Sequence, residues 1–408
     1  MKKRQSQKAS FTAAAFLVIL AACLILSLSG VVRKLAGNTD VGIHRYRPDE
    51  NGATYLGLVD WFKDTCIALC TEEFPNRVKW KEANARINRL AGKWIFEGTE
   101  VIRLNNGYLT GAGWIDYSNQ EADRLVSGFQ AFVSAELKCP YLYVQAPFKI
   151  CEEDPQLPIK WMDNYNEQTT ALLERLHSAG IDILDLRRSL HDAGFNHYDS
   201  FYITDHHWTM PTGLWAARTI AERLNRAYGL GLDLPALSDE NYFDQVWQDA
   251  FLGSWGRKVT LVYAQPEDFV LPTPIDPVHL AVTRFGTEVT GGFEALYREE
   301  EIVPEDYYQG SSYGAMLYGD CGYLTVRNLD NPDGPVVAVL RESFAGAVGP
   351  YLSLAAGELH LLDARYYEGD LEELLKEIQP DVVISLLNTQ CNVDVYFNEL
   401  YRKADAAG

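Results

Sequence analysis

From about residue 118 onward, hydrophobic positions alternate between a helical spacing and short continuous runs. The helical spacing is clear in the stripe from Leu125 to Leu137, which Ser118 and Glu121 precede as the partners of a capping box. Continuous apolar runs predict strands that are buried on both faces. We therefore expect strands at 142–145 and 181–186, a helix ending near Gly180 and a helix at about 211–228.

The same alternation returns in the C-terminal part of the chain. Strand-like runs occur at 336–340, 359–363 and 382–387, with helical stretches after Ser343, at 371–378 and at the end of the chain. Strands rich in Val, Ile and Leu that alternate with helices are typical of a parallel sheet covered on both faces. The sequence predicts an α/β fold, an α/β/α sandwich with a mostly parallel sheet.

Two regions depart from this rhythm. Residues 101–104, a turn at Asn106 and Gly107, and the following Tyr108 and Leu109 predict a β-hairpin. Residues 236–330 are rich in Tyr, Pro, Gly and Asp, and they predict an irregular or β-rich insertion between two halves of the α/β domain. Because long segments of this kind are usually functional, we expect the insertion to cover a site.

The N-terminal segment has the pattern of a membrane anchor. Residues 11–32 carry no charge, and a helix of that length reaches about 33 Å, enough to span a bilayer core of about 30 Å. Basic residues precede this run, so we expect a cytoplasmic tail at 1–10, a transmembrane signal anchor at 11–32, a tether at 33–57 and an extracellular domain at 58–408. The alternative is cleavage and lipidation at Cys23, which also places the domain outside the cytoplasm.

Composition narrows the class of partner. The chain has 408 residues, 47% of them hydrophobic, and a formal net charge of −20. Nucleic acid is not an expected partner, because phosphate binding needs a concentrated basic face. Six of the seven cysteines lie outside the predicted anchor, and their even number permits disulfides. No CxxC spacing supports a structural zinc site.

The clearest candidate chemistry is the run Asp205-His206-His207-Trp208, just before the helix expected at 211–228. A carboxylate two residues from a histidine can accept a hydrogen bond from Nδ1, which leaves Nε2 to accept a proton. This predicts His207 as a general base that Asp205 orients. Two alternatives stay open: a structural hydrogen bond within the loop, and a metal site with both histidines and Asp205 as ligands. Adjacent side chains diverge, which weighs against the metal.

A general base needs a nucleophile, and the best candidate is Ser343. It follows the apolar run 336–340 and precedes an Ala-rich stretch, whose free backbone amides are candidates for an oxyanion site. This outline is that of a nucleophile elbow, although the GxSxG pattern is absent. The alternative is that Ser343 only caps the following helix.

Four blocks of the sequence resemble one family. They are residues 205–208 (DHHW), residues 251–258 (FLGSWGRK), residues 341–345 (RESFA) with 350–352 (PYL), and residues 363–367 (DARYY). In order and spacing they resemble the DHHW family, which is similar to the SGNH hydrolase-like acyltransferases that O-acetylate alginate and other exopolysaccharides. The resemblance extends from about residue 58 to the end. It implies an SGNH hydrolase-like fold and transfer of an acyl group, such as acetyl, to a hydroxyl of a cell-surface glycan.

By position, the resemblance implies Ser343 as nucleophile, His207 as base and Asp205 as its orienting residue, with neither a cofactor nor a metal. Two positions depart from the family: Glu342 stands where Asp is usual, and Gly346 where Asn is frequent, so a possible amide donor is missing. The implied partners are a polysaccharide acceptor and a multi-pass membrane O-acyltransferase that supplies the acyl group. The alternatives are a carbohydrate esterase with the same triad and a catalytically silent glycan-binding scaffold of an export complex.

Several aromatic and basic residues in these blocks are candidates for substrate binding. They are His206, Trp208, Tyr351, Arg365 and Tyr366. Trp208 has the competing interpretation of a core residue, and Arg365 has that of an ion pair with Asp363 or Glu368.

Overall fold

The computed structural model describes residues 77–93, 95–96, 101–111, 119–159 and 161–388. The chain divides into two compact units, residues 1–87 and residues 88–408. The described part of the first is residues 77–87, which belong to helix α3 (Arg77–Leu90). No helix within the described ranges is long and apolar enough to cross a membrane. The segments expected at 1–10, 11–32 and 33–57 lie outside these ranges, as does the start of the domain at 58.

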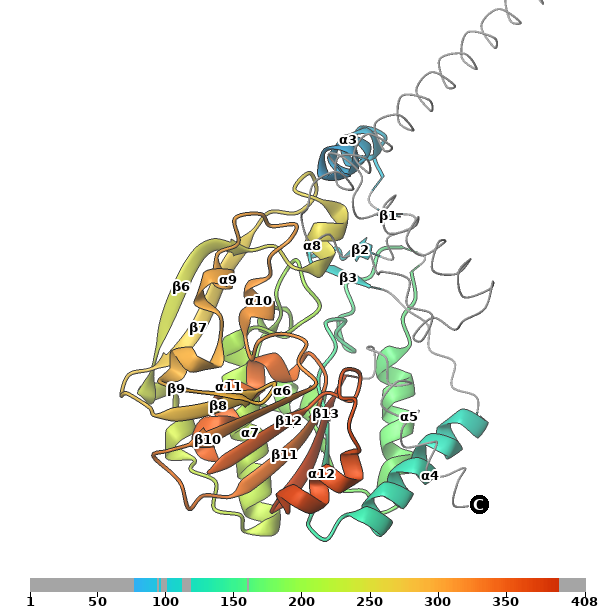
Figure 1. Cartoon of the computed structure of the whole chain (residues 1–408). Helices are drawn as coiled ribbons and strands as arrows, with labels where there is room; N and C mark the ends of the chain where they lie inside the picture. The colour runs from blue at the N-terminus through green and yellow to red at the C-terminus, as the bar shows by residue number, and fades with distance from the viewer. Residues whose placement is uncertain (1–76, 94, 97–100, 112–118, 160, 389–408) are drawn as a thin grey trace, which may run out of the picture. The chain divides into compact units, whose positions relative to one another are not determined.

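The second unit is built on an eight-stranded sheet (Figure 1). In spatial order its strands are β5 (Ile183–Asp185), β4 (Tyr141–Gln145), β13 (Val382–Leu387), β11 (Val336–Arg341), β12 (Glu358–Leu362), β10 (Tyr323–Asn328), β8 (Leu280–Arg284) and β9 (Thr287–Gly291). The first five strands are parallel, whereas β10, β8 and β9 join by antiparallel pairing. Five of the eight strands are parallel, as expected, and the sheet is mixed because residues 236–330 contribute the other three strands.

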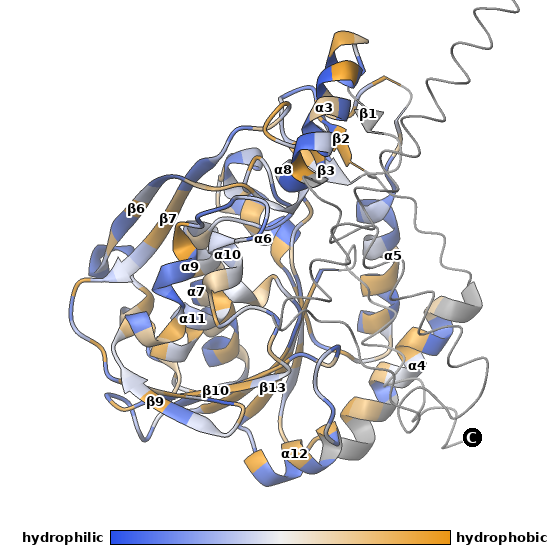
Figure 2. Cartoon of the chain, turned by 45° about the horizontal axis from the view of Figure 1, so that its top comes forward, coloured by the Kyte–Doolittle hydropathy of each residue, from blue (hydrophilic) through white to orange (hydrophobic). Residues whose placement is uncertain are grey.

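Helices cover both faces of the sheet, and alternate residues of the strands face each layer. Helices α7 (Met210–Tyr228) and α11 (Ala345–Ala355) pack on one face, where Val337 and Val339 of β11 point. Helices α4 (Asn119–Glu136), α5 (Tyr165–Ser178) and α12 (Leu371–Ile378) belong to the core on the other face, with Ala338 and Leu340. Figure 2 shows hydrophobic strands between α7 and α11 on one side and α12 and α4 on the other.

Most expected elements in the described ranges are confirmed. Helix α7 begins after Thr209, whose Oγ1 accepts a hydrogen bond from the Thr212 amide, and it ends at Gly229 in the left-handed conformation. Strand β5 is shorter than expected, because Asp185 caps a short helix, α6 (Leu186–Asp192). The last expected helix and Ser118 of the capping box lie outside the described residues.

The remaining elements are short and lie outside the eight-stranded sheet. The expected hairpin is confirmed by β2 (Val101–Arg103) and β3 (Leu109–Gly111), with β1 (Ile95–Phe96) beside it and Gly107 at φ +95° in the turn. The region 236–330 adds a two-stranded ribbon, β6 (Tyr242–Phe251) and β7 (Glu267–Pro274), and the helices α8 (Ser254–Val259), α9 (Glu299–Ile302) and α10 (Ser312–Ala315). Four 3₁₀ turns complete the description: 198–200, 235–237, 239–241 and 293–296.

Candidate active site

Asp205, His206 and His207 lie in a loop that precedes α7 in the sequence and whose two ends are paired. An isolated antiparallel bridge joins Phe201 to Trp208 at the base of this loop, and the Tyr202 amide donates to the His207 carbonyl. The two ends of the loop, at Phe201 and Trp208, are thus paired with each other, and Asp205, His206 and His207 lie between them. Local sequence supports this shape, because Thr209 and Pro211 begin α7 immediately afterwards.

The structure brings Asp205, His207 and Ser343 together. Asp205 Oδ1 lies 2.5 Å from His207 Nδ1 and also accepts the His207 amide at 3.0 Å, and His207 Nε2 lies 2.8 Å from Ser343 Oγ. Asp205 is 3% exposed. Burial alone would raise the pKa of Asp205, but the two imidazoles and the Ser254 amide hold it well below its usual value. An ionised Asp205 can therefore hold the Nδ1–H tautomer of His207, with Nε2 facing the hydroxyl.

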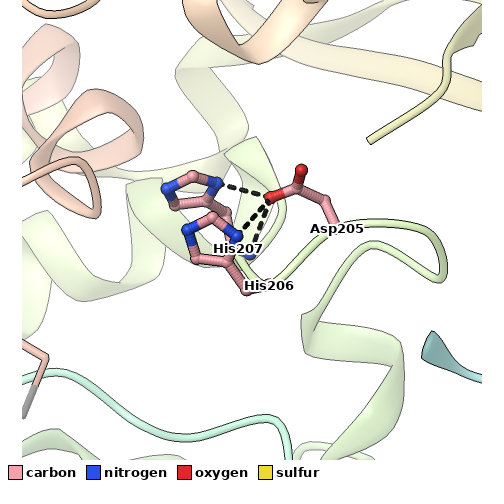
Figure 3. A group of neighbouring side chains, drawn as sticks. All are labelled: Asp205, His206 and His207. Carbon is pink, nitrogen blue, oxygen red and sulfur yellow. Dashed lines mark hydrogen bonds and ion pairs between the residues drawn. The ribbon is translucent and has the colours of Figure 1, made fainter. Parts of the chain in front are cut away.

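His206 lies beside this series and not within it. Figure 3 shows both imidazoles approaching the same oxygen of Asp205. The His206 Nδ1 atom is 3.3 Å from Asp205 Oδ1 and 3.2 Å from Ser254 Oγ, and its ring centroid lies 3.8 Å from that of His207. Although the side chain keeps 23% exposure, burial and the neighbouring His207 lower the pKa of His206. Its neutral ring lines the pocket next to His207.

Residues 251–258, the second of the four blocks that carry the family resemblance, support this loop from outside. The Ser254 amide donates to Asp205 Oδ2 at 2.5 Å, and the Gly253 amide donates to Thr204 Oγ1 at 2.9 Å. A Cβ atom at Gly253 would lie 2.3 Å from the Cβ of Asp205, so only glycine allows this approach. The block therefore orients the carboxylate that faces His207.

Contacts between α7 and α11 set the position of Ser343. Ser343 follows β11, and the indole Nε1 of Trp208 donates to the neighbouring Phe344 carbonyl at 2.9 Å. Further along the two helices, Gly213 lies so close to Ala347 that a Cβ atom would be 2.2 Å from the Ala347 carbonyl oxygen. Two segments more than 130 residues apart are thus held in register, which places the serine at the imidazole.

Tyr313 is a site residue that sequence reasoning missed. Its ring stacks on the His207 imidazole with centroids 4.0 Å apart, and its hydroxyl donates to the Ser343 carbonyl at 2.9 Å. It comes from α10, in a region without a motif, so no sequence signal pointed to it. A Cβ atom at Gly346 would lie 3.2 Å from this ring. The glycine found where the family often has Asn therefore leaves room for Tyr313.

The prediction that free amides after Ser343 form an oxyanion site is wrong, because the backbone there is hydrogen-bonded. The amides of Ala345 and Gly346 donate to the carbonyls of Glu342 and Ser343, at 3.1 and 3.0 Å. They are engaged in the turn at the start of α11 and are not free, because each amide donates to the carbonyl three residues earlier in the chain. The Ser343 amide itself donates to no acceptor in the described part of the chain.

Ser343, His206 and His207 line a pocket of about 1120 Å³. Much of its wall comes from residues 298–320 and from 254–257. These segments lie within the region expected as an insertion over a site, and they line this pocket. The wall mixes exposed acids such as Glu300 and Glu305 with the arginines Arg257, Arg298, Arg341 and Arg365.

The candidates for substrate binding divide into two groups. Trp208 and Tyr351 are both 0% exposed and belong to the core between the sheet and α7 and α11, so their assignment to substrate was wrong. Arg365 lines the pocket, but its Nε and Nη2 bind both oxygens of Asp363 at 2.9 and 2.6 Å, which is the ion pair considered as its alternative. Tyr366 is half exposed, and its hydroxyl donates to Asp320 at 3.1 Å.

A half-buried acid, Glu267, and a buried base, Lys149, fix the loop from two sides, and sequence reasoning found neither. The Lys149 ammonium donates to the carbonyls of Leu109, Tyr202 and Asp205. The Glu267 carboxylate accepts the Ile203 and Thr204 amides, both at 2.8 Å. Burial lowers the pKa of Lys149 and raises the pKa of Glu267. A single Lys or Glu in an otherwise unremarkable segment carries no signal of such a contact.

Asp205, His206 and His207 are also the group in the described residues that could hold a metal ion, with ligand atoms within 4.8 Å of one another. The ligand atoms of Asp205 and His207 are already used, since Asp205 accepts hydrogen bonds from His207 Nδ1 and the Ser254 amide, and His207 Nε2 lies at Ser343 Oγ. A metal ion would have to displace these hydrogen bonds, so the donor set fits a metal poorly. Of the cysteines, Cys139, Cys151 and Cys321 are free thiols.

The second unit thus has a mixed sheet between two helical layers, with an Asp–His–Ser series beyond the carboxyl end of a central parallel strand. Residues 140–247 match the family model described as the SGNH hydrolase-like domain of the acetyltransferase AlgX. This match includes Asp205, His206 and His207, whereas Ser343 lies beyond it.

Two solved structures are similar in fold. PatB1 from Bacillus cereus is similar with a TM-score of 0.58 and 18% identity over 71% of this chain and 95% of that one. A DHHW family protein from Eubacterium siraeum has a TM-score of 0.56 and 13% identity over 74% and 94%. At these identities the likeness shows a shared fold. No curated protein matches significantly in sequence. The resemblance to the DHHW and SGNH hydrolase-like acetyltransferase group is thereby confirmed.

Proposed function

We propose that this chain is an extracytoplasmic O-acyltransferase that transfers an acetyl group to a hydroxyl of a polysaccharide. The observation that carries the proposal is the hydrogen-bonded series from Asp205 through His207 to Ser343 at the wall of a large polar pocket. The match to the domain of an acetyltransferase supports transfer over other chemistry of the same series.

In the first half of the reaction, Ser343 takes the acyl group. His207 Nε2 accepts the hydroxyl proton while Ser343 Oγ attacks the acyl carbonyl carbon, and Asp205 stabilises the imidazolium that forms. The bond from the carbonyl carbon to the donor oxygen then breaks, and His207 returns the proton to that leaving group. The products are the acyl-serine and the deacylated donor.

In the second half, the acyl group passes from Ser343 to the acceptor hydroxyl. His207 removes the proton of a sugar hydroxyl, the sugar oxygen attacks the acyl-serine, and Ser343 leaves with the proton from His207. Water in place of the sugar would make the chain an esterase. The acceptor decides between the two activities, and the same three residues serve both.

Four variants test the assignment of roles on an acetyl-ester substrate. Ser343→Ala and His207→Ala should each lower kcat/KM by on the order of 10³-fold or more, and Asp205→Asn should be comparable because the tautomer is lost. His206→Ala should cost roughly 10-fold or less, since His206 does not contact Ser343. His191→Ala, an exposed histidine, is the matched control. A severe His206 variant with a mild His207 variant would reverse the choice of base.

Transfer is separated from hydrolysis by supplying an acceptor. With a purified polysaccharide present, ester cleavage should yield acetylated glycan at the expense of free acetate. Free acetate alone, whatever the acceptor, would indicate the esterase. No cleavage by the folded wild-type protein, and no acyl-serine in its mass spectrum, would indicate the silent scaffold.

A covalent probe tests the nucleophile without any acceptor. One of the PatB1 structures carries a sulfonyl adduct. We expect a sulfonyl fluoride to label Ser343, and labelling should be lost in Ser343→Ala and strongly slowed in His207→Ala. Labelling of another serine, with Ser343 unmodified, would contradict the proposed nucleophile.

The cellular setting is part of the same proposal. The uncharged run at 11–32 supports a single-pass membrane protein with its domain outside the cytoplasm. Because acyl-CoA is absent there, a multi-pass membrane O-acyltransferase would supply the acyl group. A reporter enzyme fused after Gly408 should be active only outside the cytoplasm. Activity of the fusion in the cytoplasm would contradict this topology.

A further inference from the structure

Glu342 touches the proposed nucleophile, yet the mechanism above gives it no part. Its side chain is fully buried, and Oε2 lies 3.1 Å from Ser343 Oγ. The other oxygen, Oε1, is buried without a hydrogen-bond partner in the described part of the chain. A buried carboxylate with an unsatisfied oxygen is costly, whereas a neutral carboxylic acid leaves only a carbonyl oxygen unpaired.

The charged groups around Glu342 do not form an ion pair with it. His207 faces it from the loop before α7, Tyr313 from α10 and Arg365 from the segment after β12. Arg365 is already bound by both oxygens of Asp363, and no cation of the described residues lies within ion-pair distance of Glu342. Burial raises the pKa of Glu342 to about 7, even though His207, Arg365 and hydrogen bonds from Ser343 and the Phe344 amide favour the ionised form.

The hydroxyl of Ser343 cannot serve both neighbours as a donor. It has one proton, and two acceptors lie within reach: His207 Nε2 at 2.8 Å and Glu342 Oε2 at 3.1 Å. If the proton points to His207, as general-base catalysis requires, an ionised Glu342 would face a lone pair of Ser343 Oγ. A protonated Glu342 would instead donate to that lone pair, and the second lone pair stays free for attack.

We propose that Glu342 acts as a neutral carboxylic acid that donates a hydrogen bond to Ser343 Oγ, and that its ionisation turns the Ser343 hydroxyl away from His207. The inference rests on the proposed function of Ser343 and adds a residue to it. An ionised carboxylate is a stronger acceptor than a neutral imidazole, so it would accept the hydrogen bond from the Ser343 hydroxyl and leave His207 Nε2 without a donor. The site would then lose activity as the pH rises through neutrality.

The first test is the pH profile of kcat/KM and of sulfonyl fluoride labelling. In the wild-type protein both rates should fall on the alkaline side, by about 10-fold for each pH unit above the ionisation of Glu342. Glu342→Gln cannot ionise but can donate through its amide. It should react about 10-fold more slowly at pH 6, because an amide is the weaker donor, and the alkaline decline should disappear. Glu222→Gln, on an exposed part of α7, should keep the wild-type profile. An alkaline decline that persists in Glu342→Gln would overturn the proposal.

A second measurement needs no catalysis. Infrared difference spectra of the wild-type protein should contain a protonated-carboxyl band near pH 6 that disappears as the pH rises through neutrality, and this band should be absent in Glu342→Gln. A band present without ester cleavage or labelling would refute the proposed function but leave the state of Glu342 intact. Cleavage without the band would do the opposite, since Glu342 would then be ionised in an active enzyme.

Discussion

Replacing Lys149 by methionine should destabilise the fold and loosen the loop that carries Asp205. Lys149 is 2% exposed, and its ammonium donates to three carbonyls, two of them in this loop. Methionine has nearly the same length but no donor, so the Leu109, Tyr202 and Asp205 carbonyls would lose their partner. Glu267, which holds the amides of the same loop, would lose the nearest positive charge.

The magnitude follows from two opposing effects. Hydrogen bonds from a charged group contribute about 1.5–3 kcal/mol each, so three of them favour the folded state by several kcal/mol. Burial of the ammonium opposes this, as the lowered pKa of Lys149 indicates. Removing one member of a buried charged group usually costs about 3–5 kcal/mol, and we expect a loss of this size in the free energy of unfolding. At about 2 °C per kcal/mol for a large domain, Tm should fall by roughly 6–10 °C.

Urea unfolding followed by tryptophan fluorescence measures this loss. Lys138→Met, at an exposed lysine, is the matched control and should stay within about 0.5 kcal/mol of the wild type. The double variant Lys149→Met/Glu267→Gln should lose less than the sum of its single variants, because both charges leave together. A cost below about 1 kcal/mol for Lys149→Met, or strict additivity in the double variant, would refute the account of a coupled clamp.

Three further outcomes are expected. Burial raises the pKa of Glu342 from 4.5 to about 7, so between these pH values the native state binds more protons than the unfolded state. The free energy of unfolding should therefore fall by about 3 kcal/mol as the pH rises across that window. Glu342→Gln should remove this pH dependence in unfolding titrations. Gly253→Ala places a Cβ atom 2.3 Å from the Cβ of Asp205. It should therefore lower the free energy of unfolding by about 1–3 kcal/mol and slow ester cleavage. Unchanged activity would show that the loop tolerates displacement. Dialysis against a chelator should leave ester cleavage intact; loss of activity together with about one equivalent of bound metal would favour Asp205, His206 and His207 as ligands.

Local patterns predicted the elements of the described region well. The apolar runs at 336–340 and 382–387 became β11 and β13, and the helix expected at 371–378 is α12. The pairing of Asp205 with His207 also followed from spacing alone, because a carboxylate two residues away reaches Nδ1 within one loop. The family resemblance, and not spacing, linked that pair to Ser343.

Tertiary structure decided the features that depend on residues far apart in the chain. Strands β8, β9 and β10 add an antiparallel edge to the mostly parallel sheet that the sequence predicted. The sequence did not predict this edge, because antiparallel pairing between distant strands has no mark in the local sequence. Burial removed Trp208 and Tyr351 from the substrate pocket, and stacking brought Tyr313 to His207 from a segment without a motif. Sequence by itself determines what a residue can do chemically and which local structure it favours. Which groups meet, and how deeply they are buried, depends on packing between distant segments, and that burial gives Glu342 and Lys149 their altered acidity.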